Sequence, residues 1–398
     1  MKHALASCAL IALAAPAAAQ TFERGERNTD FQPAFNEQFR APLVESDVAL
    51  ATEEVAGDLV HPWGIDVLPE DGGYLVTERP GRLRHVAEDG TLSDPIAGVP
   101  EVLAERQGGL LDVKVAPDFA DSRRIYMTYA KPLEDNLSAT AAAYATLSED
   151  MTELTDVTEI FVQAPGSTAP MHYGSRVVFD GEGHVFITTG EHSTQQYREF
   201  AQDLDKTYGK VIRLTLDGEV PEDNPFVDDE EAVDSIWSYG HRNMQGATMI
   251  DGELWTIEHG PQGGDELNLT EPGLNYGWPV VSYGEQYGGG IIGSGNASAE
   301  GMQEPVYFWD PVIAPGDMTV YEGEMFPEWE GDLLIGALVR GGLVRLSLED
   351  GMVTEEESLV RDLGRVRDVT VDDDGSILAI TDFENGQIVR ITPAETDS

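Results

Sequence analysis

The sequence predicts an all-β protein, a six-bladed β-propeller of four-stranded antiparallel blades, over residues 46–393. A unit of two apolar strands with an alternating pattern, joined by an Asp/Gly turn, occurs six times along the chain. Most copies are followed by a further strand, and helical patterns are almost absent. Such repetition is typical of a propeller, in which each unit forms one blade around a central channel. A β-sandwich is the alternative, but six matching units favour radial repetition.

The six strand pairs are expected at residues 64–77, 109–128, 174–188, 246–256, 317–336 and 368–381. Their apolar and polar residues alternate, as in strands with one face toward a core. Further strands are expected at 81–86 and 209–214, and one or two helical turns at 200–206. Because the loops of all blades converge on one end of the channel, residues far apart in the sequence can meet there.

The chain begins with the features of an export signal. Lys2 and His3 precede an apolar run, and residues 17–19 are alanines that match a cleavage site. We therefore expect a signal peptide at 1–19, a polar N-terminal extension at 20–45, and a periplasmic or secreted product after cleavage. The only cysteine, Cys8, lies in the signal peptide, so no disulfide is expected in the exported chain.

Acidic residues dominate the composition. The chain has 73 Asp and Glu against 24 Lys and Arg, a formal net charge of −49. Such a field repels phosphate backbones and anionic membranes, which excludes nucleic acid as a partner. No later segment is apolar enough for membrane insertion, and a monomer or homodimer is expected. We interpret the acidic surface as a solubility device, so arginines in glycine-rich loops become candidates for holding an anionic ligand.

Residues 236–279 hold the densest group of candidate functional side chains. Arg242, Asn243, Asp265 and Glu266 stand here among glycines and aromatic residues. Loops on a rigid scaffold are where binding and catalytic residues concentrate, so this stretch predicts a pocket floor. A solvated loop region is the alternative interpretation.

A metal site is predicted inside that stretch. Gly260 and Pro261 precede two more glycines and the carboxylates of Asp265 and Glu266, so backbone carbonyls can turn toward side-chain oxygens. Ligation by oxygen alone selects a hard cation, and an irregular, carbonyl-rich geometry favours Ca²⁺ over Mg²⁺. An ordinary acidic turn is the alternative.

His172 is the candidate general base. It precedes the third strand pair, where a loop would reach the channel mouth, and imidazole titrates near neutral pH. Glu191, in the turn that closes the same pair, can return to orient the ring. A hydrogen-bonded structural histidine is an equally good interpretation. For Gln107, at the head of the second pair, a functional and a structural role are likewise equally good interpretations.

Arg365 and Arg367 stand two residues apart at the entry to the last strand pair. This spacing places both guanidiniums on the same side of a strand, and paired guanidiniums suit carboxylates. Two surface charges that balance an acidic protein are the alternative.

Together these motifs resemble the soluble quinoprotein aldose dehydrogenase family, which is related to the soluble glucose dehydrogenases dependent on pyrroloquinoline quinone (PQQ). The resemblance covers residues 61–392 and depends on seven ordered motifs: 107–112, 172–176, 209–214, 238–243, 258–268, 275–279 and 365–368.

The resemblance implies PQQ lying over a Ca²⁺ at the channel mouth, with an aldose as the small-molecule substrate and an unknown electron acceptor. It makes His172 the catalytic base and assigns Arg242 to a developing oxyanion, with Glu191 as support for the base. The cofactor contacts it implies are Gln107, Arg242, Asn243, Asp265, Tyr287, Arg365 and Arg367. The positions it associates with calcium are Gly260, Pro261, Glu266 and Tyr276.

Two departures from the family pattern matter. Met171 precedes the expected base where relatives carry Asp or Asn, and Arg340 stands near the position of a cofactor-pairing lysine. The expected activity is PQQ- and calcium-dependent oxidation of aldoses to lactones. The alternatives are a calcium-dependent lactonase-type propeller, against which the arginine pair argues, and a non-catalytic sugar-binding propeller, against which His172 argues.

Overall fold

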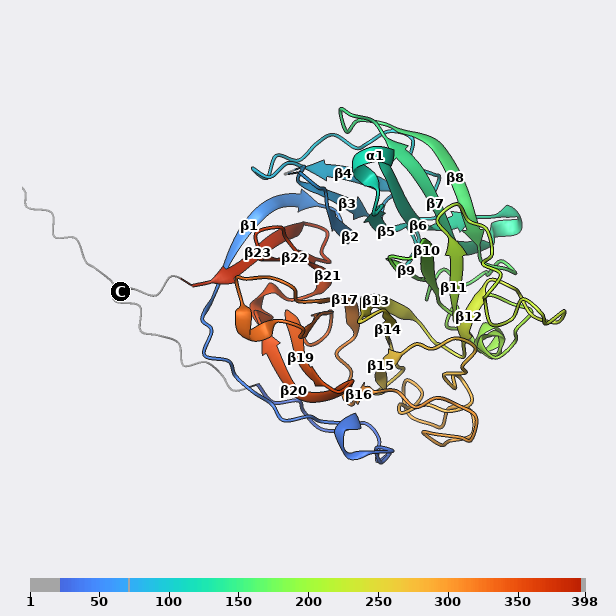
Figure 1. The fold of residues 1–398 in the computed structure, drawn as a ribbon. Helices are drawn as coiled ribbons and strands as arrows, with labels where there is room; N and C mark the ends of the chain where they lie inside the picture. The colour runs from blue at the N-terminus through green and yellow to red at the C-terminus, as the bar shows by residue number, and fades with distance from the viewer. Residues whose placement is uncertain (1–21, 71, 395–398) are drawn as a thin grey trace, which may run out of the picture.

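The computed structural model describes residues 22–70 and 72–394. Six antiparallel sheets surround a central axis, and their order around the ring follows the chain (Figure 1). Five sheets have four strands and one has three. This arrangement confirms the predicted six-bladed propeller, with a first blade that is one strand short. The expected signal peptide and Cys8 lie outside the described residues.

The first three blades run from the innermost strand outward. Blade 1 contains β2 (Pro62–Val67), β3 (Tyr74–Glu78) and β4 (Arg82–Val86). Blade 2 contains β5 (Leu110–Val115), β6 (Arg124–Pro132), β7 (Ser138–Leu147) and β8 (Leu154–Val162). Blade 3 contains β9 (Gly174–Phe179), β10 (His184–Thr189), β11 (Lys210–Thr215) and β12 (Ile236–Tyr239).

The second half of the ring repeats this order. Blade 4 contains β13 (Met244–Ile250), β14 (Glu253–Glu258), β15 (Asp265–Leu269) and β16 (Tyr307–Trp309). Blade 5 contains β17 (Pro315–Val320), β18 (Leu333–Ala337), β19 (Leu343–Glu349) and β20 (Met352–Leu359). Blade 6 contains β21 (Val366–Val371), β22 (Ile377–Thr381), β23 (Gly386–Pro393) and, as its outer strand, β1 (Leu50–Leu59).

All six predicted strand pairs are present as the two innermost strands of their blades. Their short turns need backbone conformations that favour glycine. Gly73, before β3, has φ +77°, and a Cβ there would lie 2.2 Å from the carbonyl oxygen of Val86. The strands expected at 81–86 and 209–214 are β4 and β11. Alternation and turn chemistry therefore locate the inner part of each blade.

The ring is closed by the first and the last of the described strands. β1 pairs with β23 in antiparallel register from Leu50 opposite Pro393 to Leu59 opposite Gly386, and the two strands lie side by side in blue and red in Figure 1. Sequence analysis did not predict β1. Most of its residues are exposed or partly exposed, so it lacks the apolar alternation of the inner strands.

The segment before β1 runs along the outside of blades 4 and 5 (Figure 1). Phe39 forms a β-bridge with Phe308, and their rings stack at 4.5 Å. The backbone amides of Asn28 and Thr29 donate to the carboxylate of Asp310 at 2.8 and 2.9 Å. These contacts attach the extension to the propeller.

Helices are few and short. The two α-helices are α1 (Phe119–Ser122) and α2 (Gln195–Arg198). The 3₁₀ turns are η1 (Asn36–Gln38), η2 (Glu134–Asn136), η3 (Glu199–Ala201), η4 (Pro327–Trp329) and η5 (Arg361–Leu363). Within residues 22–394, residue 71 aside, no helix is long and apolar enough to span a bilayer.

Each of the six interfaces between neighbouring blades holds an apolar cluster. The channel itself is crossed by a buried charge cluster. Arg176 of β9 lies 2.9 Å from Asp112 of β5, 2.9 Å from Asp368 of β21 and 3.4 Å from Asp317 of β17. Its Nε donates to the carbonyl of Gln245 in β13 at 2.7 Å. One side chain thus joins five of the six inner strands directly beneath the channel mouth.

Candidate active site

The mouth of the channel contains a cavity of about 260 Å³ that is lined from all six blades or their loops. Seven of the residues predicted from the sequence lie here together: Gln107, His172, Arg242, Asn243, Tyr287, Arg365 and Arg367. The other lining residues are Trp63, Arg79, Gln245, His259, Ala314, Leu338 and Asp382. We call this space the central cavity.

His172 and Glu191 form a buried pair at the edge of the central cavity. Nδ1 of His172 lies 2.7 Å from Oε2 of Glu191, and the histidine amide donates to Oε1 of Gln107 at 2.8 Å. Burial lowers the pKa of His172, with Glu191 opposing this shift, so the ring is neutral at neutral pH. Burial alone would raise the pKa of Glu191, but His172 and Arg242 hold it at about 2.

Met171 gives His172 no polar support. Its sulfur instead lies 3.6 Å from a guanidinium nitrogen of Arg106. The carboxylate that orients the histidine ring therefore comes from Glu191, across the turn after β10. Because Nδ1 is engaged, Nε2 is the nitrogen left to meet a ligand.

Arg242 faces the central cavity with unsatisfied hydrogen-bonding groups. Its Nη1 donates to the carbonyl of His259 at 2.8 Å and its backbone amide to Glu258, but Nε and Nη2 are buried without a partner among the described residues. The neighbouring Asn243 accepts a 3.1 Å hydrogen bond from the amide of Gly174, which fixes the loop beside His172. Buried donors without partners are uncommon in folded proteins, so these groups are candidates for binding a ligand.

Arg365 and Arg367 lie on the same side of the strand entry, as their spacing predicts. Their Nη2 atoms donate to Oδ2 of Asp382 at 3.2 and 2.6 Å, and Nη1 of Arg367 donates to Gln245 at 2.6 Å. Nε of Arg367 is buried without a partner among the described residues. Although Asp382 is buried, the two arginines hold its pKa far below the ordinary value.

The predicted calcium residues line a second, much smaller cavity of about 10 Å³ next to the central one. This volume is of the order needed for a single water or ion. Gly260, Pro261, Glu266 and Tyr276 all contribute to its wall, together with Glu258. The hydroxyl of Tyr276 donates to the carbonyl of Leu269, outside the cavity, so this residue contributes its ring.

The small cavity is anionic. Glu258 of β14 and Glu266 of β15 are paired opposite one another in the sheet. Burial, and then the charges of Glu258 and Glu304, raise the pKa of Glu266 well above its ordinary value. No cluster of three or more His, Cys, Asp and Glu side chains suited to a metal occurs in 22–70 and 72–394. A cation here would therefore depend on backbone oxygens.

Asp265 lies beneath the cavities and lines neither of them. Its carboxylate is fully buried and accepts hydrogen bonds from the amides of Gly260 at 2.7 Å, Ile313 at 2.8 Å and Ala314 at 2.7 Å. Burial raises its pKa to about 7, against the effect of these amides. Asp265 thus positions two site loops, and its contact with a cofactor stays a prediction.

Arg340 likewise lies outside the central cavity. Its Nη1 donates to Oε1 of buried Glu356 at 2.6 Å, and its guanidinium lies 4.6 Å from the ring centre of Phe22. Arg340 therefore does not take the place of the family's cofactor-pairing lysine in the central cavity.

Sequence analysis missed several residues of the site, of which Asp382, Gln245 and Glu258 bind its arginines. Asp382 directly follows the last strand of the sixth predicted pair. Glu191 holds a similar position after the third pair, so the same signal could have identified Asp382. His259 lines the site but is held by a 3.1 Å contact of Nε2 with Gln245, and burial and two arginines lower its pKa.

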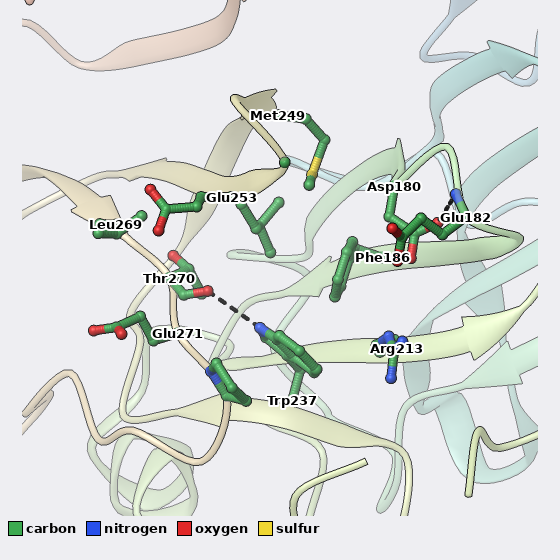
Figure 2. Close-up of a pocket in the computed structure, with 13 residues that line it drawn as sticks. Asp180, Glu182, Phe186, Arg213, Trp237, Met249, Glu253, Leu269, Thr270 and Glu271 are labelled. Atoms are coloured by element: carbon green, nitrogen blue, oxygen red, sulfur yellow. Dashed lines mark hydrogen bonds between the residues drawn. The ribbon is translucent and has the colours of Figure 1, made fainter. Parts of the chain in front are cut away.

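A separate hollow of about 280 Å³ lies at the interface of blades 3 and 4, between Phe186, Trp237, Met249 and Leu254 (Figure 2). Its rim carries acidic side chains, and Arg213 lies 5.0 Å from the ring of Trp237. None of the residues predicted to act in binding or catalysis lines it, so we place the candidate site at the channel mouth.

Comparison with known proteins assigns the family. The model of the glucose/sorbosone dehydrogenase family matches residues 59–390. The chain belongs to this family. It is 43% identical over 350 residues to the aldose sugar dehydrogenase YliI of Escherichia coli, covering 87% of this chain and 94% of that protein. The extension at residues 22–45 lies outside the span that the family model matches.

Solved structures of family members have the same fold. The apo-form of the soluble aldose sugar dehydrogenase from Escherichia coli superposes with a TM-score of 0.84 and 41% identity, over 87% of this chain and all of that one. The PQQ-bound aldose sugar dehydrogenase from Streptomyces coelicolor superposes with a TM-score of 0.69 and 25% identity, over 86% of this chain and 99% of that one.

Proposed function

We propose that this chain is an exported PQQ- and Ca²⁺-dependent dehydrogenase that oxidises aldose sugars to lactones in the central cavity. The main support is a set of buried guanidinium nitrogens, on Arg242 and Arg367, that have no partner in the described part of a protein with a net charge of −49. Buried donors of this kind are costly unless a ligand satisfies them.

The residues of the central cavity fit PQQ, which carries three carboxylates on a flat ring system. Arg365 and Arg367 would hold carboxylates, because guanidiniums match them in both charge and geometry. Arg242 and Asn243 would hold the opposite side, and the exposed ring of Tyr287 borders the same space. The aldose sugar dehydrogenase from Streptomyces coelicolor has been solved in a PQQ-bound form.

The small cavity fits Ca²⁺. No backbone amide among the described residues donates to the carbonyl oxygens of Gly260 or Pro261. A Cβ on Gly260 would lie 2.1 Å from the carbonyl oxygen of Gly264 and 2.4 Å from that of Gly263, so carbonyls crowd around this glycine. Carbonyls beside the carboxylate of Glu266 form the oxygen-rich environment that a hard cation prefers.

His172 and its partners supply the proton chemistry. With Nδ1 held by Glu191, Nε2 removes the proton from the anomeric hydroxyl of the sugar, and the charge of Glu191 stabilises the imidazolium that forms. The guanidinium of Arg242 stabilises the negative charge that develops on the anomeric oxygen. When bound, PQQ supplies the acceptor for the hydride from the anomeric carbon, and Ca²⁺ supplies Lewis-acid polarisation.

The two rival functions have less support. A lactonase-type hydrolase needs a carboxylate-rich metal centre and leaves Arg365 and Arg367 without a role. A sugar-binding propeller without activity does not need the buried pair of His172 and Glu191, whose formation requires the desolvation of a carboxylate.

Reconstitution tests the proposal. The apo-protein is incubated with PQQ and Ca²⁺, and reduction of a dye is followed with several aldoses. We expect sugar-dependent reduction that is lost when PQQ is omitted and is at least about 100-fold slower in His172→Ala, the typical contribution of a general base. His85→Ala, on an outer strand, is the matched control. Absence of reduction with every aldose would refute the proposed function.

A further inference from the structure

A second hollow opens beside the central cavity. It has a volume of about 410 Å³, and its wall is formed by Phe22, Arg24 and Asn28 of the extension and by five loops of the propeller. The loop residues are Pro261, Gln262, Gly263, Tyr287, Pro311, Val312, Val339, Arg340 and Arg361. We call this space the side hollow. Its size is within the range of small-molecule sites.

The side hollow and the central cavity are neighbours. Tyr287, which is 70% exposed, lines both of them. In the loop between β18 and β19, Leu338 faces the central cavity and the adjacent Val339 faces the side hollow. A ligand that extends from the central cavity past Tyr287 therefore enters the side hollow.

The side hollow is cationic in a strongly acidic protein. Arg24, Arg340 and Arg361 line it, and no carboxylate does. Arg24 and Arg340 share a single ion-pair partner, Glu356, at 3.1 and 2.6 Å. The guanidinium of Arg361 has no hydrogen-bond or ion-pair partner in the described part of the chain and lies 5.1 Å from the ring centre of Phe22. The three guanidiniums of the side hollow thus have one carboxylate among them as an ion-pair partner in the described part of the chain.

We propose that the side hollow is a subsite for a carboxylate-bearing sugar unit, such as a uronic acid, linked to the aldose that is oxidised. Arg361 binds the carboxylate, while Tyr287, Pro261 and Val339 offer apolar surface to the C–H face of the ring. The assignment as a substrate subsite rests on the proposed function, because oxidation at the anomeric carbon leaves the rest of an oligosaccharide to be accommodated outside the central cavity.

Binding is measured first, without turnover. Titration calorimetry of the apo-protein uses methyl glucuronide, which cannot be oxidised at its blocked anomeric carbon, and compares it with methyl glucoside, acetate and inorganic phosphate. We expect only methyl glucuronide to bind appreciably. We also expect Arg361→Gln to weaken binding roughly tenfold, the loss of one charge-assisted hydrogen bond. Arg82→Gln, the same change on β4 of blade 1, is expected to leave binding unchanged.

A second variant fills the space. Val339 is 65% exposed, and Val339→Tyr is expected to abolish methyl glucuronide binding. In the reconstituted enzyme, both variants should raise KM for a glucuronate–glucose disaccharide. Arg361→Gln should leave KM for cellobiose unchanged. Neither variant should change the turnover of glucose.

Three results would overturn the subsite. These are equal binding of methyl glucoside or phosphate, unchanged affinity in Arg361→Gln, and displacement of methyl glucuronide by PQQ, which would assign the space to the cofactor. If binding behaves as expected but no aldose is oxidised, the proposed activity fails while the acidic-sugar site remains.

Discussion

Replacing Glu191 with glutamine tests the role of the buried pair without changing its shape. The amide oxygen of Glu191→Gln can still accept from Nδ1 of His172, whose present contact is 2.7 Å, but the negative charge is lost. A hydrogen bond to a charged group contributes about 1.5–3 kcal/mol. If this contribution stabilises mainly the imidazolium, kcat falls about 10- to 150-fold, at about 1.36 kcal/mol per decade.

The pH profile distinguishes this role from a structural one. His172 must be neutral to accept a proton, so activity is lost as the pH falls through its pKa, which burial places below the ordinary value. Removal of the Glu191 charge disfavours the protonated ring further. The acid limb of kcat/KM should therefore move to lower pH in Glu191→Gln, while PQQ affinity stays the same.

The assay is dye reduction by enzyme reconstituted with PQQ and Ca²⁺, at several pH values. Glu159→Gln is the matched control, because Glu159 lies on β8, the outermost strand of blade 2, where it accepts hydrogen bonds from Tyr129 at 2.9 Å and Lys131 at 2.7 Å. A Glu191→Gln enzyme with kcat within twofold of the parent and an unmoved acid limb would show that the carboxylate does not support the base.

Three further predictions concern the cofactor, the cation and the extension. Replacing Arg365 and Arg367 together by glutamine should weaken PQQ binding about 100-fold or more, measured by fluorescence titration; intact affinity would remove the pair from the site. Ca²⁺ at 100 times its Kd should stabilise the apo-protein by about 2.7 kcal/mol, with a smaller rise in Tm in Glu266→Gln, and equal rises would place the ion elsewhere. Glu356→Gln should lower the free energy of unfolding by about 3–5 kcal/mol in urea, because Arg24 and Arg340 lose their buried partner. A change below 1 kcal/mol would contradict this account.

The inner strands were predictable because each pair combines an alternating apolar pattern of strand length with an Asp/Gly turn. The outer strands were less so. β7 reads SATAAAYATL, and alanine favours helix, yet eight of its ten residues, all but Tyr144 and Thr146, are buried in the strand. Burial between β6 and β8 overrides this preference. β16 is only three residues long and follows a long glycine-rich loop, so its pattern is too short to recognise.

The site residues were predictable where one short sequence motif contains both the functional side chain and the glycine-rich loop that carries it. His172, Arg242 and the arginine pair stand out as ionisable groups in glycine-rich loops, and the structure brings them together. Asp382 and Gln245 gain their roles only because blades 6 and 4 meet at the channel mouth. The hydrogen bonds of Asp265 were not predictable for the same reason, because the amides that bind its carboxylate come partly from a loop 48 residues away.

The pairing of β1 with β23 also has a consequence for how the molecule is made. β1 is the first and β23 the last of the described strands, so blade 6 cannot be completed until every other blade has been synthesised. Until then blade 6 lacks a strand, and exposed strand edges can pair with other chains. Contacts between such distant segments also slow folding. Deletion of β23 (Gly386–Pro393) should therefore leave β1 without its partner, open the ring and favour aggregation.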